Sequence, residues 1–301
     1  MRIDGADRER YWECTISASG VVALDALSGN IESDTPVIIT ATGAAGSIAD
    51  QAHEGRAGWG GAARTVVAGA DLSEQFYVYM QTRRSTANHR LGGAATVVMA
   101  QPIEHGDFND VFAIGGGGGS QGIATPWKAT IYCGAGSGGD GGFADAAIAD
   151  ISAPGANPTV AYGVGTDGQH GNIDGACGGR VDLGNPGHGG GHGVGGVQPG
   201  DSRSNGVAGI GGIGGGNNWQ DKYGNNPAPG YEAGRGGQTS VHAQGGGGYG
   251  GGAGGERNGG GGAGGSVGAA PTASPLDASL IADDLQPGHG AGFVTLLYPA
   301  D

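Results

Sequence analysis

The sequence predicts an all-β protein in which a β-sandwich is interrupted by a glycine-rich insertion. Segments rich in Val, Ile, Thr and aromatic residues recur through the first 114 residues and return near the C-terminus. Of the 73 glycines in the 301 residues, 57 lie in two stretches, 12 in 115–142 and 45 in 155–268. No segment shows a sustained 3.6-residue repeat of apolar residues, which argues against an α/β fold.

The expected strands share a high content of β-branched and aromatic residues. They are 12–18, 35–42, 64–68, 75–81, 94–100, 110–114, 128–133 and 292–298. The segment 75–81 carries apolar residues on both faces, which suits a central strand of a sandwich. Two short segments, 142–151 and 277–285, are the best candidates for helices.

The glycine-rich stretches predict either a flexible linker or a packed bundle of polyglycine II helices. Two features favour the bundle: strand-like segments bracket the stretches, and single apolar residues are scattered within them. These residues are Val207, Ile210, Ile213, Val241 and Tyr249. A polyglycine II helix has about three residues per turn and no internal hydrogen bonds, so neighbouring helices must pair with its backbone. A collagen triple helix is excluded, because 245–252 breaks the Gly-X-Y repeat.

The chain divides into four parts on this interpretation. Residues 1–20 form an N-terminal docking segment, 21–114 the first part of the sandwich, 115–268 the glycine-rich insertion, and 269–301 a return segment with the closing strand. The closing strand implies that one sheet holds both ends of the insertion, which lowers the entropic cost of ordering it.

The charge and the cysteine content exclude several classes of protein. The formal net charge is −14 and no basic run occurs, which argues against binding to nucleic acid. No stretch of 18 apolar residues occurs, so we expect no membrane insertion. Three cysteines, an odd number, make reduced thiols the default. The N-terminus lacks the apolar core of a signal peptide, so synthesis in the cytoplasm without secretion is expected.

No constellation in the sequence predicts an enzyme, a cofactor or a metal site. The pair His188 and His192 would bind a metal on a helix, but the three glycines between them disfavour a helix. The segment 167–175 lacks the alternating oxygen ligands of a calcium loop. No Gly-x-Ser-x-Gly motif is present, and no Gly-Lys-Ser/Thr follows a glycine run. We therefore expect no catalytic residues.

One glycine-poor interruption, 217–232, is the candidate receptor-binding segment. Its aromatic rings stand among Asn, Gln and Asp, a combination that suits contact with a sugar or a protein. The candidate binding residues are Trp219, Asp221, Tyr223 and Tyr231. The alternative interpretation is that Trp219 and Tyr223 only cover the end of the bundle. A second polar loop, 198–205, would join the same surface if it lies at the same end.

Several segments in a fixed order resemble the glycine-rich domain family. They are Val37–Gly46, Gly60–Val67, Phe76–Met80, Val111–Gly119, Gly245–Gly265 and the terminal Gly-Phe-Val-Thr strand at 292–295. The resemblance implies a jelly-roll-like sandwich with an inserted polyglycine II bundle. The family includes the extracellular region of anaplastic-lymphoma-kinase-type receptors and phage tail and fibre adhesins. The receptor domains are secreted and disulfide-bonded, which does not suit this sequence.

The resemblance, together with the absence of a signal peptide, predicts a phage virion protein, such as a minor tail, tail-tip or fibre protein. The sandwich would dock on other tail proteins, and the bundle would present loops to a glycan or protein on the host surface. We expect a homo-oligomer, and a trimer would suit a tail tip. The alternatives are an antifreeze-type ice-binding protein, which needs a flatter and more regular face, and a secreted ligand-binding module.

Overall fold

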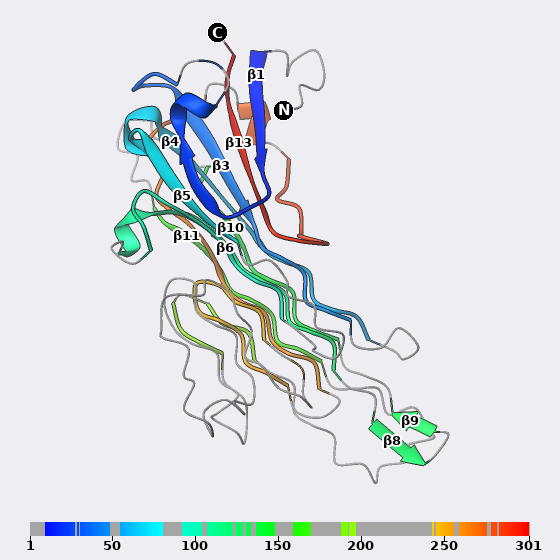
Figure 1. The fold of residues 1–301 in the computed structure, drawn as a ribbon. Coiled ribbons are helices and arrows are strands. Elements are labelled where there is room, and N and C mark those ends of the chain that lie inside the picture. Colours follow the sequence, from blue (N-terminus) through cyan, green and yellow to red (C-terminus); the bar gives the residue numbers. More distant parts are fainter. Residues whose placement is uncertain are drawn as a thin grey trace.

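The structure is a computed structural model. It describes residues 10–27, 29, 31–48, 55–80, 92–103, 107–122, 125–128, 131–133, 137–147, 159–169, 188–191, 193–196, 243, 245–255, 259–275, 278–281 and 283–300, with only the backbone of 125–128, 131–133, 278 and 279. In this part of the chain the regular structure is almost entirely β (Figure 1). The helices described are single 3-10 turns, of which the longest are η3 (Gly69–Leu72) and η7 (Ala278–Ile281).

Two sheets form the sandwich. The five-stranded sheet has the order β1 (Tyr11–Ile16), β13 (Phe293–Pro299), β3 (Pro36–Thr42), β4 (Ala62–Ala68) and β10 (Phe143–Asp145). The six-stranded sheet has the order β11 (Ala161–Gly163), β12 (Ser266–Gly268), β7 (Val111–Gly115), β6 (Thr96–Met99), β5 (Gln75–Met80) and β2 (Gly20–Ala23). Neighbouring strands are antiparallel, except that β10 runs parallel to β4. A separate hairpin joins β8 (Thr125–Lys128) to β9 (Ile131–Cys133).

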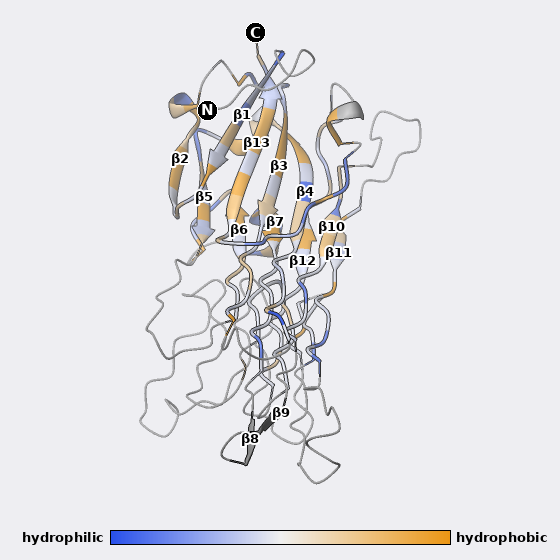
Figure 2. Cartoon of the chain, turned by 90° about the vertical axis from the view of Figure 1, so that its right-hand side faces the viewer, coloured by the Kyte–Doolittle hydropathy of each residue, from blue (hydrophilic) through white to orange (hydrophobic). Residues whose placement is uncertain are grey.

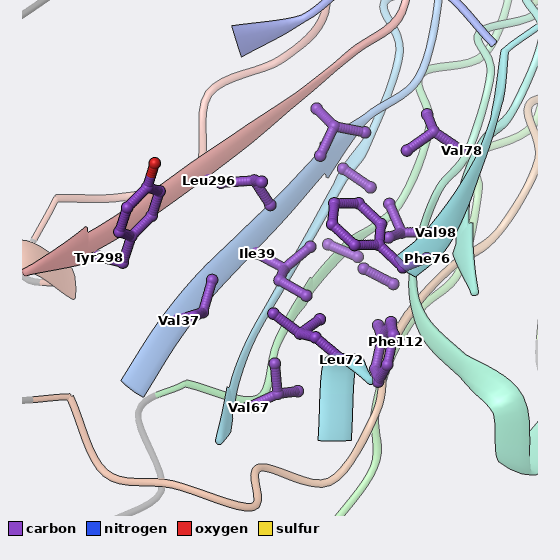
Figure 3. Close-up of a cluster of buried hydrophobic side chains, with 14 of the residues drawn as sticks. Val37, Ile39, Val67, Leu72, Phe76, Val78, Val98, Phe112, Leu296 and Tyr298 are labelled. Atoms are coloured by element: carbon purple, nitrogen blue, oxygen red, sulfur yellow. The ribbon is translucent and has the colours of Figure 1, made fainter. Parts of the chain in front are cut away.

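The main hydrophobic core lies between the two sheets (Figure 3). Alternate residues of β13 point inward, so Val294, Leu296 and Tyr298 are buried while their neighbours are partly exposed. Phe76 and Val78 of β5 meet them from the other sheet. This period of two is what a half-buried strand requires, and each fully buried side chain of this size contributes about 1.5–3 kcal/mol.

The strands expected at 12–18, 35–42, 64–68, 94–100 and 110–114 are confirmed as β1, β3, β4, β6 and β7, whereas the short strands β2, β10, β11 and β12 were not predicted. The strand expected at 292–298 is confirmed as β13, and the one expected at 75–81 is confirmed as β5. The helix expected at 142–151 is wrong, because Phe143–Asp145 forms β10 and pairs with β4. The expected strand at 128–133 is a hairpin, β8 and β9. The helix expected at 277–285 is reduced to η7, a single 3-10 turn.

Glycine-rich segments continue the strands of both sheets into a bundle, which we call the glycine bundle. They are 43–48 after β3, 55–61 before β4, 92–95 before β6, 116–122 after β7, 137–142 before β10, 164–169 after β11 and 259–265 before β12. The described residues of 188–196 and 245–255 also belong to the bundle. Figure 2 shows hydrophobic residues concentrated in the sandwich strands and mostly pale segments below them. The bundle thus draws on residues before 115 as well as on 115–268.

Backbone hydrogen bonds in the bundle repeat every third residue. In 259–265, the amides of Gly261 and Gly264 donate to the carbonyls of Ser120 and Gly117, with N–O distances of 3.0 and 2.9 Å. The other amides of this segment donate to two other segments with the same three-residue spacing. Gly260 and Ala263 donate to Gln169 and Thr166, and Gly262 and Gly265 donate to Ala253 and Gly250.

The carbonyls of 259–265 accept from two further segments, 137–142 and 188–196, and again from 245–255. Gly261 accepts from Gly139, Gly262 from Gly246 and Ala263 from Gly190, with distances of 2.8–2.9 Å. This segment is therefore surrounded by hydrogen-bonded neighbours. A Cβ atom on Gly264 would overlap the carbonyl of Gly247, so the close packing requires glycine there.

Candidate functional site

The four residues predicted to bind a receptor, Trp219, Asp221, Tyr223 and Tyr231, lie outside the described residues, as does the loop 198–205. The β8–β9 hairpin lies at the end of the molecule opposite the outer ends of β1 and β13 (Figure 1). Tyr11 pairs with Pro299 at that other end, so the sandwich and the hairpin occupy opposite ends.

The best-defined candidate site among the described residues surrounds Trp59, on the flank of the bundle. Trp59 is 39 % exposed although it stands in a segment of glycine and alanine. The guanidinium carbon of Arg56 lies 4.5 Å from the centre of the indole ring. The ring of His289 meets the indole nearly edge-on, with centroids 4.7 Å apart and planes at 74°. Cationic and aromatic groups therefore hold the indole in one position.

Asp140 fixes both Arg56 and Trp59. The two Nη atoms of Arg56 donate to the two carboxylate oxygens of Asp140, each at 2.6 Å, and the Trp59 amide donates to Oδ1 at 2.8 Å. Burial alone raises the pKa of the Asp140 carboxyl, but the hydrogen bonds from Arg56 and from the Trp59 amide outweigh it, so the pKa lies below its ordinary value. The same bond raises the pKa of Arg56. Both groups are charged at neutral pH.

His289 is held in place by backbone bonds on both sides. Gly288 and Gly60 exchange two hydrogen bonds, both 2.8 Å, and the carbonyl of Gly290 accepts from Ala45 at 2.9 Å. A Cβ on Gly288 or on Gly60 would overlap the carbonyl of Gly43, so the turn can approach the bundle only because both are glycine. The imidazole therefore projects from a turn with fixed ends.

A hollow of about 330 Å³ opens beside these rings. Its lining consists of small residues together with one aliphatic, two aromatic and one cationic side chain: Ala45, Gly46, Ile48, Arg56, Ala57, Trp59 and His289. Ile48 is 54 % exposed at its rim. A hollow with a few polar groups around an aromatic ring is the usual form of a small-molecule binding site.

This site was not predicted from the sequence. The available signal was a Trp flanked directly by glycines, Gly58-Trp59-Gly60, in a stretch where nearly every side chain is small. His289 is 230 positions later in the chain and carries no motif that links it to Trp59. Only the pairing of Gly60 with Gly288 brings the two rings together.

A second group of aromatic side chains, of which Tyr162 is exposed and Phe108 and Tyr249 are partly buried, lies over the six-stranded sheet. Tyr249 stacks on Phe108 with centroids 4.8 Å apart and lies 6.0 Å from Tyr162. Phe108 and Tyr249 pack on the small core formed by residues such as Val111 and Val267. These rings therefore cover a hydrophobic cluster, which accounts for their position.

The described residues contain no group of three or more His, Cys, Asp or Glu side chains that could hold a metal ion. His188 contacts Asp167 instead, with Nδ1 and Oδ2 2.9 Å apart. His192 lies outside the described part of the chain. Within that part, no helix has the length and apolar character needed to cross a membrane.

Comparison with models of known protein families gives no match for this chain. Comparison with curated protein sequences gives none either. The evidence for function is therefore the architecture and the geometry of the sites themselves.

Proposed function

We propose that the glycine bundle consists of polyglycine II helices carried by a jelly-roll-like sandwich. The support is the three-residue period of the hydrogen bonds made by Gly261 and Gly264, and by Gly262 and Gly265. A helix with three residues per turn turns every third amide toward the same neighbour. Hydrogen bonds from one segment to several neighbours on all sides are the pattern that such packing requires, because each backbone amide and carbonyl needs a partner.

We further propose that the protein is a structural component of a phage virion, belonging to the tail, the tail tip or a fibre, and that it acts in attachment to the host. The observation that carries this proposal is the placement of the sandwich and the β8–β9 hairpin at opposite ends of a cross-bonded bundle (Figure 1). A protein that joins a particle to a surface needs a docking part and a presenting part held apart by a stiff spacer. The bundle supplies that spacer without a large hydrophobic core.

The partners in this proposal are other tail proteins and further copies of the same chain at the sandwich, with a trimer as the form that suits a tail tip. The host contact is a surface glycan or protein, bound through the segment 217–232. No enzymatic step is part of the proposal, and the glycine bundle acts as a scaffold. Localisation is in the virion after synthesis in the host cytoplasm.

Immunogold electron microscopy of purified particles tests the location. An antibody against the sandwich is expected to label the tail end of particles, whereas presence in the infected-cell lysate and absence from purified particles would contradict the proposal. Attachment is tested separately by competition. The purified chain is expected to reduce adsorption of particles to host cells, and a variant with Trp219, Tyr223 and Tyr231 all replaced by Ala should not.

A further inference from the structure

We propose that the hollow beside Trp59 binds one pyranose unit of a glycan. The site lies on the flank of the bundle, formed by the segments 45–48 and 56–59 and the turn at His289. It is distinct from the segment 217–232 and does not depend on it. The proposal therefore adds a second contact point, formed by residues other than those of that segment.

The size of the hollow suits a single sugar ring. Its volume is about 330 Å³, at the lower end of the range for small-ligand sites, about 300–1,000 Å³. Small residues, including Ala45, Gly46 and Ala57, form part of the lining and leave that space open. A protein segment that used the hollow would bury one side chain in it, whereas a pyranose ring would also engage the polar groups at its edge.

The groups around the hollow match the two kinds of surface that a pyranose presents. The C–H groups of a sugar ring pack against aromatic rings, and the exposed part of the Trp59 indole offers such a surface. The hydroxyl groups both donate and accept hydrogen bonds. Among the described residues, the indole N–H of Trp59 and the ring nitrogens of His289 have no hydrogen-bond partner. They supply two donors and one acceptor when the imidazole is neutral.

The charges at the hollow favour a neutral ligand. Arg56 and Asp140 are the charged groups that face Trp59, and each is bonded to the other through two hydrogen bonds. An anionic ligand would have to compete with the carboxylate that the guanidinium already holds. An uncharged ligand that is rich in hydroxyl groups would not have to compete with that carboxylate.

The site is formed before any ligand arrives. The Trp59 amide and carbonyl are both bonded, to Asp140 and Gly141, and the turn at His289 is held by Gly60 and Ala45. A site whose side chains and backbone are already ordered loses little conformational entropy on binding. Weak contacts with a single sugar can therefore give measurable affinity.

Saturation-transfer NMR on the full chain tests the proposal directly. The probes are the methyl pyranosides of glucose, galactose, mannose, rhamnose and N-acetylglucosamine, each at millimolar concentration. We expect transfer to the ring protons of at least one of them, with a dissociation constant of about 1 mM. Trp59→Ala is expected to weaken binding about tenfold or more, and His289→Ala by a smaller factor.

Tyr162→Ala serves as the matched control, because Tyr162 is 40 % exposed and belongs to a different surface. It should leave binding unchanged. Trp59→Phe keeps an aromatic ring without the N–H, so it keeps the test informative if Trp59→Ala unfolds. No transfer from any pyranoside, or binding that survives both Trp59→Ala and His289→Ala, would overturn the inference. The outcome of the competition assay with the 217–232 variant concerns the proposed function alone.

Discussion

The hydroxyl of Ser266 accepts a hydrogen bond from the amide of Gly116, with a distance of 2.8 Å, where the six-stranded sheet passes into the glycine bundle. The same hydroxyl donates to the carbonyl of Gly142 at 2.6 Å. Ser266 is fully buried, so water cannot take the place of its hydroxyl in these hydrogen bonds. One side chain thus joins three segments at the junction of sandwich and bundle.

Ser266→Ala is expected to destabilise the protein by roughly 1–3 kcal/mol, because it leaves a buried amide without a partner. Thermal or urea unfolding measures the change. The control is the same deletion at Ser47, whose buried hydroxyl has no hydrogen-bond partner among the described residues. Ser47→Ala should be neutral or slightly stabilising. Equal losses for the two variants would contradict the role assigned to Ser266.

The ion pair of Arg56 and Asp140 joins the segments 55–61 and 137–142 on the bundle flank. Because both side chains are partly exposed, a double-mutant cycle with Arg56→Ala and Asp140→Ala is expected to give a coupling energy of about 0.5–1 kcal/mol at neutral pH. Asp140→Asn should also weaken the fixation of the Trp59 amide. A coupling energy of zero would show that the pair does not stabilise the flank.

The pH dependence of this coupling has a definite sign. The pKa of Asp140 is lowered in the folded state, so the contribution is complete above the unfolded-state value of about 4. It is lost as the pH falls through the lower folded-state pKa. Repeating the cycle at a series of acidic pH values should therefore show the coupling energy falling below about pH 4. A coupling energy that does not change over that range would contradict the assignment.

Gly264→Ala is expected to destabilise the bundle by at least about 2 kcal/mol, because the new methyl group would overlap the backbone carbonyl of Gly247. Backbone cannot move aside as a flexible side chain can. Gly20→Ala is the control, since a Cβ there meets no atom within 4 Å. Unfolding temperatures should fall by several degrees in the first variant and stay the same or rise in the second. Tolerance of Ala at 264 would mean that 259–265 is not closely packed.

Strands with a strong apolar pattern could be predicted from the sequence. The segments that became β5 and β13 contain enough β-branched and aromatic residues to specify a half-buried strand alone. The three-residue strands β10, β11 and β12 contain Phe-Ala-Asp, Ala-Tyr-Gly and Ser-Val-Gly, which have no strand pattern of their own. Their conformation depends on neighbours, as when Val267 pairs with Ile114.

The glycine content predicted that backbone would pack against backbone, but not which segments would take part. The segments 43–48, 55–61 and 92–95 belong to the bundle although they lie outside the two long glycine-rich stretches, 115–142 and 155–268. The site at Trp59 was missed for a related reason. Trp59 with Arg56, Asp140, and His289 come from three separate segments that only the hydrogen bonds of the bundle align.

Amide hydrogen exchange separates a packed bundle from a flexible linker. The amides of Gly117 and Gly264 donate to Gly247 and Gly117 at 2.7 and 2.9 Å, and both residues are buried. Uniformly 15N-labelled protein is therefore expected to show many glycine amides that exchange as slowly as the strand amides of residues such as Val98. A linker would exchange them at the rate of an unfolded chain. In Gly264→Ala, the amides around residue 264 should exchange fast. The sandwich amides should stay protected, because we expect the core between the two sheets to remain in place when the bundle is lost.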